Sequence, residues 1–207
     1  VDAMVGEVLA GLDTCGRTDS TCVVFTSDHG DLQMEHGQNR KSAMYEGSVR
    51  VPLIAAGPDI APGRVCDRLV SLVDLYPTML DVAGLAPTRD LDGRSLGPEL
   101  AGRTSDRPDA VWSQYHAGLQ NTGSFMVREG DWKYVHYAGF GPQLFDLAND
   151  PDEIENRAGQ EPDVAARLER ALRACVDCEA VDAEAKAQNR WAFQHWREQS
   201  TEAHVRK

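Results

Sequence analysis

The chain has 207 residues, and its 21 Lys and Arg residues against 33 Asp and Glu residues give a formal net charge of −12. This charge argues against a nucleic-acid or anionic-membrane partner, because both need a cationic face. No run approaches the roughly 18 to 20 apolar residues of a membrane span, and the first residues lack the basic segment of a signal peptide. The compartment stays unassigned between cytoplasm and periplasm.

The first expected elements are a helix and a strand. Apolar residues recur at helical spacing, which predicts a helix packed on one face and ending near Gly16: Val1, Val5, Val8, Leu9 and Leu12. Residues 21–26 form an apolar, β-branched run without alternation, typical of a strand covered on both faces in a parallel sheet. Asp28 and His29 follow this strand at its carboxyl end, where open α/β sheets bind ligands.

Two further apolar runs follow, at residues 51–56 and 69–73. Asp74 is the expected N-cap of the next helix, with Pro77 in its first turn and Gly84 at its end. Residues 86–108 are rich in Pro, Gly, Asp and Arg, which is typical of a crossing between domains. We therefore expect two domains, at residues 1–108 and 109–207.

The expected second domain begins with short segments that are rich in aromatic residues. Four short strands are expected, at residues 111–115, 124–128, 132–137 and 143–147, with a hairpin turn at residues 129–131. A helix is expected from Pro162 to Cys175, and the aromatic residues near the end predict a terminal segment docked on the body: Trp191, Phe193 and Trp196. The pattern predicts a small antiparallel sheet covered by helices.

The five cysteines do not form a disulfide framework, because their number is odd and the chain is large. Cys175 and Cys178 have the spacing of a zinc or redox pair. They lie inside a helical pattern without a second such pair, so we interpret them as half-buried helix cysteines.

Asp28 and His29 are candidate metal ligands, since a carboxylate and a neutral imidazole both bind divalent cations. The alternative from the residues alone is a capped strand end with a hydrogen-bonded histidine. Lys41 supplies a positive charge that could hold an anionic ester oxygen.

A series of motifs resembles the carboxyl-terminal part of the sulfatases, in the alkaline-phosphatase superfamily. In chain order they are residues 24–30, Glu35-His36-Gly37, Lys41 with Tyr45-Glu46-Gly47, residues 50–54 and residues 74–78. Residues 130–134, and residues 144–147 with Asp150-Pro151 and Glu153, are similar to that family's C-terminal subdomain. Ser27 to Gly30, Tyr115-His116 and residues 142–145 most resemble the group of arylsulfatase K and its bacterial relatives.

The resemblance implies an α/β fold: the end of an alkaline-phosphatase-like, mainly parallel sheet domain, then a small antiparallel sheet plus helix subdomain. Asp28 and His29 would coordinate calcium or another divalent cation. Lys41 would be catalytic, binding a sulfate oxygen and stabilising charge on the leaving group. His36 would line the substrate pocket, with turn packing as the alternative. His116 would reach the substrate as a catalytic and binding residue, with an ordinary strand histidine as the alternative.

One family feature is missing from the sequence. Sulfatases attack with a formylglycine made from a Cys/Ser-x-Pro/Ala-x-Arg motif, and none of the five cysteines opens that pattern. Two further metal-binding aspartates, which the family takes from its first strand, are also missing. We therefore expect a fragment, the C-terminal portion of a longer sulfatase, that is inactive by itself.

Other readings stay open at this point. A phosphonate or phosphate ester hydrolase of the same superfamily has a similar metal-carrying segment, and a non-catalytic homologue or subunit would keep the fold without the reaction. The acidic balance favours a small sulfate ester, such as a sulfated sugar, over a long sulfated polymer. An incomplete sheet exposes apolar edges, so we expect self-association.

Overall fold

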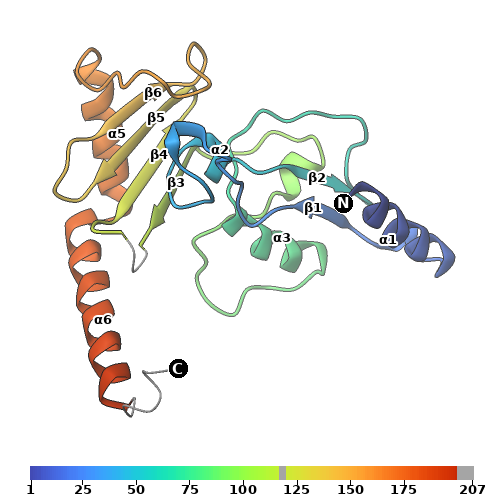
Figure 1. Cartoon of the computed structure of the whole chain (residues 1–207). Coiled ribbons are helices and arrows are strands. Elements are labelled where there is room, and N and C mark those ends of the chain that lie inside the picture. Colours follow the sequence, from blue (N-terminus) through green and yellow to red (C-terminus); the bar gives the residue numbers. More distant parts are fainter. Residues whose placement is uncertain (117–119, 200–207) are drawn as a thin grey trace. The chain divides into compact units, whose positions relative to one another are not determined.

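The computed structural model describes residues 1–116 and 120–199, and it divides the chain into two compact units (Figure 1). The first unit holds residues 1–30 and 50–109, and the second holds residues 31–49 and the chain from residue 110 onward. The expected domains at residues 1–108 and 109–207 stay a prediction. The compact units differ from them in that residues 31–49 group with the second half of the chain.

The first unit contains two short strands and several helices. Strand β1 (Val23–Thr26) pairs with β2 (Leu53–Ala56) in antiparallel register, with Val23 opposite Ala56. The helices are α1 (Asp2–Thr14), α3 (Leu75–Val82) and α4 (Gly97–Leu100), with 3₁₀ turns η1 (Thr18–Ser20) and η3 (Leu72–Asp74). We expected residues 21–26 to form a strand of a parallel sheet that is covered on both faces. The pairing of β1 with β2 is instead antiparallel, and all residues of β1 are half-buried.

Helix α1 ends as the sequence predicts. Gly16 has a φ of 62° and donates to the carbonyl of Asp13, while Arg17 donates to the carbonyl of Leu12. These two bonds form a Schellman motif, in which a left-handed residue satisfies the last carbonyls of the helix. The predicted packing of its apolar stripe is not seen, because no residue of α1 is buried and Val8 is 70% exposed.

Asp74 organises the loop that follows α3. Its carboxylate accepts from the backbone N–H of Ser71 at 2.9 Å and of Arg94 at 2.8 Å, and it pairs with Arg107 at 2.8 Å. It is the N-cap residue of α3 by position, but its side chain makes no capping bond to α3 and caps the η3 turn instead. Gly93 is required here, because a Cβ would lie 2.2 Å from the carbonyl oxygen of Val73.

The second unit is built on the predicted antiparallel sheet. Its strands are β3 (Ala110–Tyr115), β4 (Ser124–Glu129), β5 (Trp132–Tyr137) and β6 (Gln143–Asp146), in the spatial order β3-β4-β5-β6. The β4–β5 hairpin pairs Glu129 with Trp132 across a two-residue turn, and Gly130 takes the positive φ of 56° that such turns need. All neighbouring strands are antiparallel.

Both faces of this sheet carry buried side chains. Helix α5 (Pro162–Cys175) and the start of α6 (Cys178–Gln199) cover one face, where the core contains Phe125, Val127, Tyr134, Leu144, Leu168, Leu172 and Cys178. On the other face Met126 and Val135 pack with Met44, which precedes α2 (Glu46–Val49). Figure 1 shows α5 behind the sheet and the segment that leads into α2 in front of it. Residues 31–49 therefore share a core with the second sheet.

Helix α6 docks only by its first turns. Cys178 and Asp182 are buried, whereas Trp191 is 63% exposed and Phe193 is also exposed. The expected docking of the terminal segment thus holds for the start of α6 and not for its aromatic end. Within residues 1–116 and 120–199, no helix is both long and apolar enough to cross a bilayer.

The loop before α2 contains a strained position that can be tested. Met34 is 66% exposed and has a φ of 77°, a left-handed conformation that costs a non-glycine residue about 1–2 kcal/mol. We predict that Met34→Gly raises the free energy of unfolding by up to about 1 kcal/mol, measured by urea denaturation. The control, Met4→Gly in α1, should lower it by about 1 kcal/mol. A loss of stability in Met34→Gly would contradict the assigned backbone strain.

Candidate functional site

Asp28 and His29 lie side by side after β1. The Nδ1 of His29 is 2.8 Å from the carbonyl oxygen of Gly30, and its Nε2 is 3.3 Å from Oδ2 of Asp28. A carbonyl only accepts hydrogen bonds, so in the neutral ring Nδ1 donates and Nε2 carries a lone pair. Two lone pairs then face each other, and a cation or a proton between them removes the repulsion. The pair therefore fits the donor set of a divalent cation.

These two residues supply only part of a metal site. Across the part of the chain that the structure describes, no group of three or more His, Cys, Asp or Glu residues is placed to hold an ion. Calcium takes six to eight oxygen ligands, and an imidazole nitrogen is more common with transition metals. Asp28, whose side chain is 81% exposed, and His29 therefore need further ligands to bind calcium.

Lys41 lies in the loop that precedes α2. Its side chain is exposed and makes no hydrogen bond or ion pair with any residue that the structure describes. Its backbone is fixed, because the carbonyl of Lys41 accepts from Oγ of Ser48 at 2.7 Å and Ser48 is buried. The geometry thus presents an uncompensated ammonium group on an anchored backbone, which suits the binding of an anion.

The loop from residue 31 to residue 40 is held in a strained conformation. Four of its non-glycine residues have a positive φ: Gln33, Met34, His36 and Arg40. Leu32 is fully buried and donates to the carbonyl of Arg40 at 2.8 Å, while Asp31 accepts from the backbone N–H of Gln33 at 2.9 Å. Each such residue costs about 1–3 kcal/mol, and strain of this kind concentrates at functional sites. This observation supports placing a site next to Lys41.

His36 packs against Tyr45. The two rings are stacked, with centroids 3.7 Å apart and planes 6° from parallel. Tyr45 in turn accepts from Nε2 of Gln143 at 3.2 Å. The structure therefore places His36 in the packing arrangement that the sequence left open as an alternative, and its contact with substrate stays a prediction.

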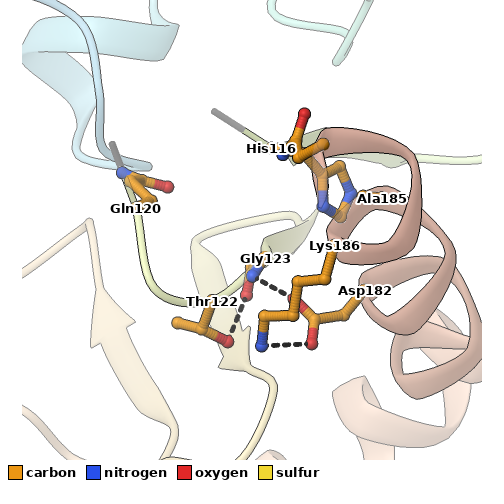
Figure 2. Close-up of a pocket in the computed structure, with 8 residues that line it drawn as sticks. His116, Gln120, Thr122, Gly123, Asp182, Ala185 and Lys186 are labelled. Carbon is orange, nitrogen blue, oxygen red and sulfur yellow. Dashed lines mark hydrogen bonds and ion pairs between the residues drawn. The ribbon is translucent and has the colours of Figure 1, made fainter. Parts of the chain in front are cut away.

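His116 follows β3 and faces α6 across a shallow pocket (Figure 2). Its ring contacts the edge of Phe125, with centroids 5.1 Å apart, and its buried Nε2 has no hydrogen-bond partner among the described residues. Gly123 is required beneath it, since a Cβ there would lie 2.6 Å from Cε1 of His116. The pocket is lined by His116, Gln120, Thr122, Gly123, Asp182, Ala185, Lys186 and Asn189.

Asp182 anchors α6 at this pocket. Its carboxylate accepts from the backbone N–H of Gly123 and from Nζ of Lys186, each at 2.7 Å. Burial alone would raise the pKa of Asp182, but the bonds from Lys186 and Gly123 hold that pKa below its ordinary value. Asp182 therefore stays ionised at neutral pH and fixes the start of α6 to the β3–β4 connection.

The predicted residues fall into two groups. Asp28 and His29 belong to the first compact unit, and His36, Lys41 and His116 belong to the second. Within the second unit Ser42, beside Lys41, lies with its Oγ 3.3 Å from the hydroxyl of Tyr115, beside His116. The structure thus brings the Lys41 loop to the end of β3.

A cluster of charged residues that the sequence did not predict joins the start of α2 to the second sheet. Glu46 pairs with Lys133 at 2.9 Å and with Arg128 at 3.1 Å. Lys133 is fully buried and also pairs with Glu153 at 2.7 Å. These residues lie in the motifs that resemble the sulfatases, but a lysine in a strand is usually exposed. The sequence therefore does not predict that Lys133 is buried between two carboxylates.

A comparison with protein families shows the family to which the chain belongs. A family model described as N-sulphoglucosamine sulphohydrolase, C-terminal, matches residues 34–177, which is well over half of the chain. The chain belongs to this sulfatase family. The resemblance to sulfatases is therefore confirmed, and so is the predicted fold class, with its antiparallel sheet and covering helices.

Relatives of the chain include arylsulfatase K of Xenopus laevis, which is 42% identical over 207 residues. That match covers 95% of this chain and 39% of the relative, so the chain spans about two fifths of the relative's length. A phosphonate monoester hydrolase of Agrobacterium radiobacter is similar in structure, with a TM-score of 0.74, 31% identity and coverage of 91% of this chain and 39% of that one. A protein solved with its substrate D-glucosamine-2-N,6-O-disulfate has a TM-score of 0.75, 30% identity and coverage of 90% and 39%.

A carboxylate on α6 shows how the docking of this helix depends on pH. Glu179 accepts from Nη1 of Arg173 at 2.7 Å and lies 3.1 Å from Nε2 of His136. The hydrogen bond from Arg173, with smaller effects that include the charge of His136, lowers the pKa of Glu179 to about 2 from an ordinary 4.5. A lowered folded-state pKa means that this group stabilises the fold above pH 4.5 and loses its contribution as the pH falls towards 2.

We predict that Glu179→Gln lowers the free energy of unfolding at pH 7 by less than about 1 kcal/mol, because Glu179 is half exposed and solvent screens the pair. The difference from the wild type should shrink as the pH falls below 4.5, measured by urea denaturation at pH 7, 4 and 3. Glu184→Gln, on the exposed surface of α6, is the matched control and should change little. A constant difference at all three pH values would argue against the assigned role of Glu179.

Proposed function

We propose that this chain is the C-terminal part of a sulfatase that hydrolyses sulfate esters with a formylglycine nucleophile carried by another part of the protein. The observation that carries the proposal is Lys41, a cation on an anchored loop that has no ion-pair partner among residues 1–116 and 120–199 and lies inside the region that matches the sulfatase family. A cation in this position can bind a sulfate oxygen and stabilise the charge that develops as the ester bond breaks. By itself the chain would not turn over substrate.

Asp28 and His29 would hold a divalent cation, which we propose is calcium as in the family that the motifs resemble. The metal, when bound, supplies positive charge to oxygens of the sulfate group. In this chain the bond from His29 to the carbonyl of Gly30 keeps Nε2 turned towards Asp28. His29 is thus oriented before any ion binds, which is the usual role of the second hydrogen bond of a ligand histidine.

The substrate that we propose is a small sulfate ester, such as a sulfated sugar. One structural relative was solved with D-glucosamine-2-N,6-O-disulfate, which is a substrate of this class. The net charge of −12 disfavours attraction of a long polyanion. His36 and His116 are the candidate residues that would contact the rest of such a substrate, and both lie in the unit that contains Lys41.

A second candidate function is hydrolysis of phosphonate or phosphate esters. The similarity to the phosphonate monoester hydrolase of Agrobacterium radiobacter favours it, because a phosphonate monoester also presents anionic oxygens on a tetrahedral centre to a metal and a lysine. The two functions predict different preferred substrates when the complete protein is assayed with matched aryl sulfate and aryl phosphonate esters.

Activity of the complete protein tests the proposed role of Lys41. We predict that Lys41→Ala lowers kcat for a sulfate ester by about 10²–10³-fold, the usual cost of losing one group that stabilises developing charge. Arg40→Ala, which removes the neighbouring charge, is the control and should retain activity. Sulfatase activity also requires a Cys/Ser-x-Pro/Ala-x-Arg motif in the coding sequence upstream of Val1. Its absence would support the non-catalytic homologue.

Calorimetric titration of calcium tests the proposed metal ligands. We predict that the complete protein binds calcium and that Asp28→Ala weakens binding at least about tenfold, as a lost ligand contact does. Asp19→Ala removes the same charge from the exposed η1 turn and should leave the affinity unchanged. Equal affinity in the two variants would remove Asp28 from the site. The 207-residue chain by itself, with two candidate ligands, should bind calcium weakly.

A further inference from the structure

Three motifs that the proposed chemistry does not use meet in one buried ionic network. Glu46 comes from the Tyr-Glu-Gly motif, Lys133 from residues 130–134, and Glu153 follows Asp150-Pro151. The Nζ of Lys133 lies 2.9 Å from Oε1 of Glu46 and 2.7 Å from Oε1 of Glu153. The backbone N–H of Glu46 donates to Oε2 of Glu153 at 2.6 Å.

The network is buried at its centre and balanced in charge, with the side chains of Arg128 and Glu46 partly exposed at 24% and 16%. Lys133 and Glu153 are buried in the second unit, and Arg128 pairs with the second oxygen of Glu46 at 3.1 Å. Two cations therefore face two carboxylates. Removing a single member leaves an uncompensated charge out of water, which is far more costly than removing an oppositely charged pair together. The network therefore holds its four members in one arrangement.

The network leads to the backbone of Lys41 through α2. Glu46 is the first residue of α2, and Ser48, in the same helix, donates to the carbonyl of Lys41. Met44, between Lys41 and Glu46, packs with Val135, which lies on the same strand as Lys133. Displacement of Glu46 from Lys133 would therefore move the helix that anchors Lys41.

We propose that Lys133 and Glu153 are positioning residues for Lys41. They fix α2 to the second sheet, and α2 fixes the backbone from which the Lys41 ammonium group reaches an anion. The proposal rests on the role of Lys41 in the proposed function for its consequence in catalysis, and on contacts within the second unit for the coupling itself. No direct contact between Lys133 and substrate is implied.

Hydrogen exchange measured by mass spectrometry tests the coupling without an assay of activity. Lys133→Met should increase exchange of residues 41–49 by about tenfold or more, while exchange in α5 changes much less. Lys186→Met, which removes a lysine paired with Asp182 at α6, is the matched control and should leave residues 41–49 unchanged. Unchanged exchange of residues 41–49 in folded Lys133→Met would overturn the proposal.

A second variant keeps the test decisive if Lys133→Met does not fold. Glu153→Gln preserves the size of the side chain and removes one charge, and it should increase exchange of residues 41–49 to a smaller extent. Unchanged exchange of these residues in Glu153→Gln would count against the proposal. Where Lys133→Met does fold, the double variant with Glu153→Gln leaves only the Glu46–Arg128 pair, so it should exchange more slowly than Lys133→Met alone. Additive effects of the two substitutions would show that they act separately, against the proposal.

Hydrolysis of a sulfate ester by the complete protein separates this proposal from the proposed function. Lys133→Met should lower kcat/KM at least about tenfold, and the double variant should recover part of the loss. If exchange increases but Lys41→Ala leaves hydrolysis unchanged, the coupling is supported and the catalytic role of Lys41 is overturned. If Lys41→Ala abolishes hydrolysis but Lys133→Met alters neither exchange nor kcat/KM, the positioning role is overturned and the proposed function stands.

Discussion

The ammonium group of Lys133 is the constraint on which the second unit depends. A charge that is removed from water needs opposite charges and hydrogen-bond acceptors around it. Here the two carboxylates come from α2 and from the loop after β6. Residues 31–49 therefore pack on the sheet although some sixty residues of the first unit separate the two along the chain. A hydrophobic side chain at position 133 could bury the same area without selecting Glu46 as its neighbour.

The two faces of the sheet are stabilised by different physics. On the face covered by α5, aromatic and aliphatic side chains form the larger core. On the face covered by α2, a small cluster around Met44 lies beside the ionic network. The hydrogen bonds within these ion pairs are directional, whereas apolar contacts are not, so this second face specifies the position of the Lys41 loop more narrowly than its small apolar area could.

The sequence predicted elements well where one local pattern decides them. Alternating aromatic strands, the turn at Gly130 and the periodic residues of α5 each follow from neighbours along the chain. The prediction was wrong for the packing of the apolar stripe of α1, which depends on distant segments: no residue of α1 is buried. The antiparallel pairing of β1 with β2 also does not follow from the local run of residues, although the predicted fold class is confirmed. The same limit explains the site. Lys41 and Asp28 can be read from motifs, but the partners of Glu46 lie more than eighty residues away and follow no local spacing.

The candidate site gains its chemistry from groups that are set before a ligand arrives. Asp28 and His29 direct two lone pairs at each other, an arrangement that is unfavourable until a cation or a proton lies between them. Lys41, which has no charged partner among the described residues, extends from a backbone held by Ser48 and by a strained loop. Binding an anion then fixes one flexible side chain and not a whole segment, so less of the binding free energy is spent on ordering. If Lys41 binds the anion as proposed, the ion pairs of Lys133 contribute to function through rigidity, although they lie outside the site.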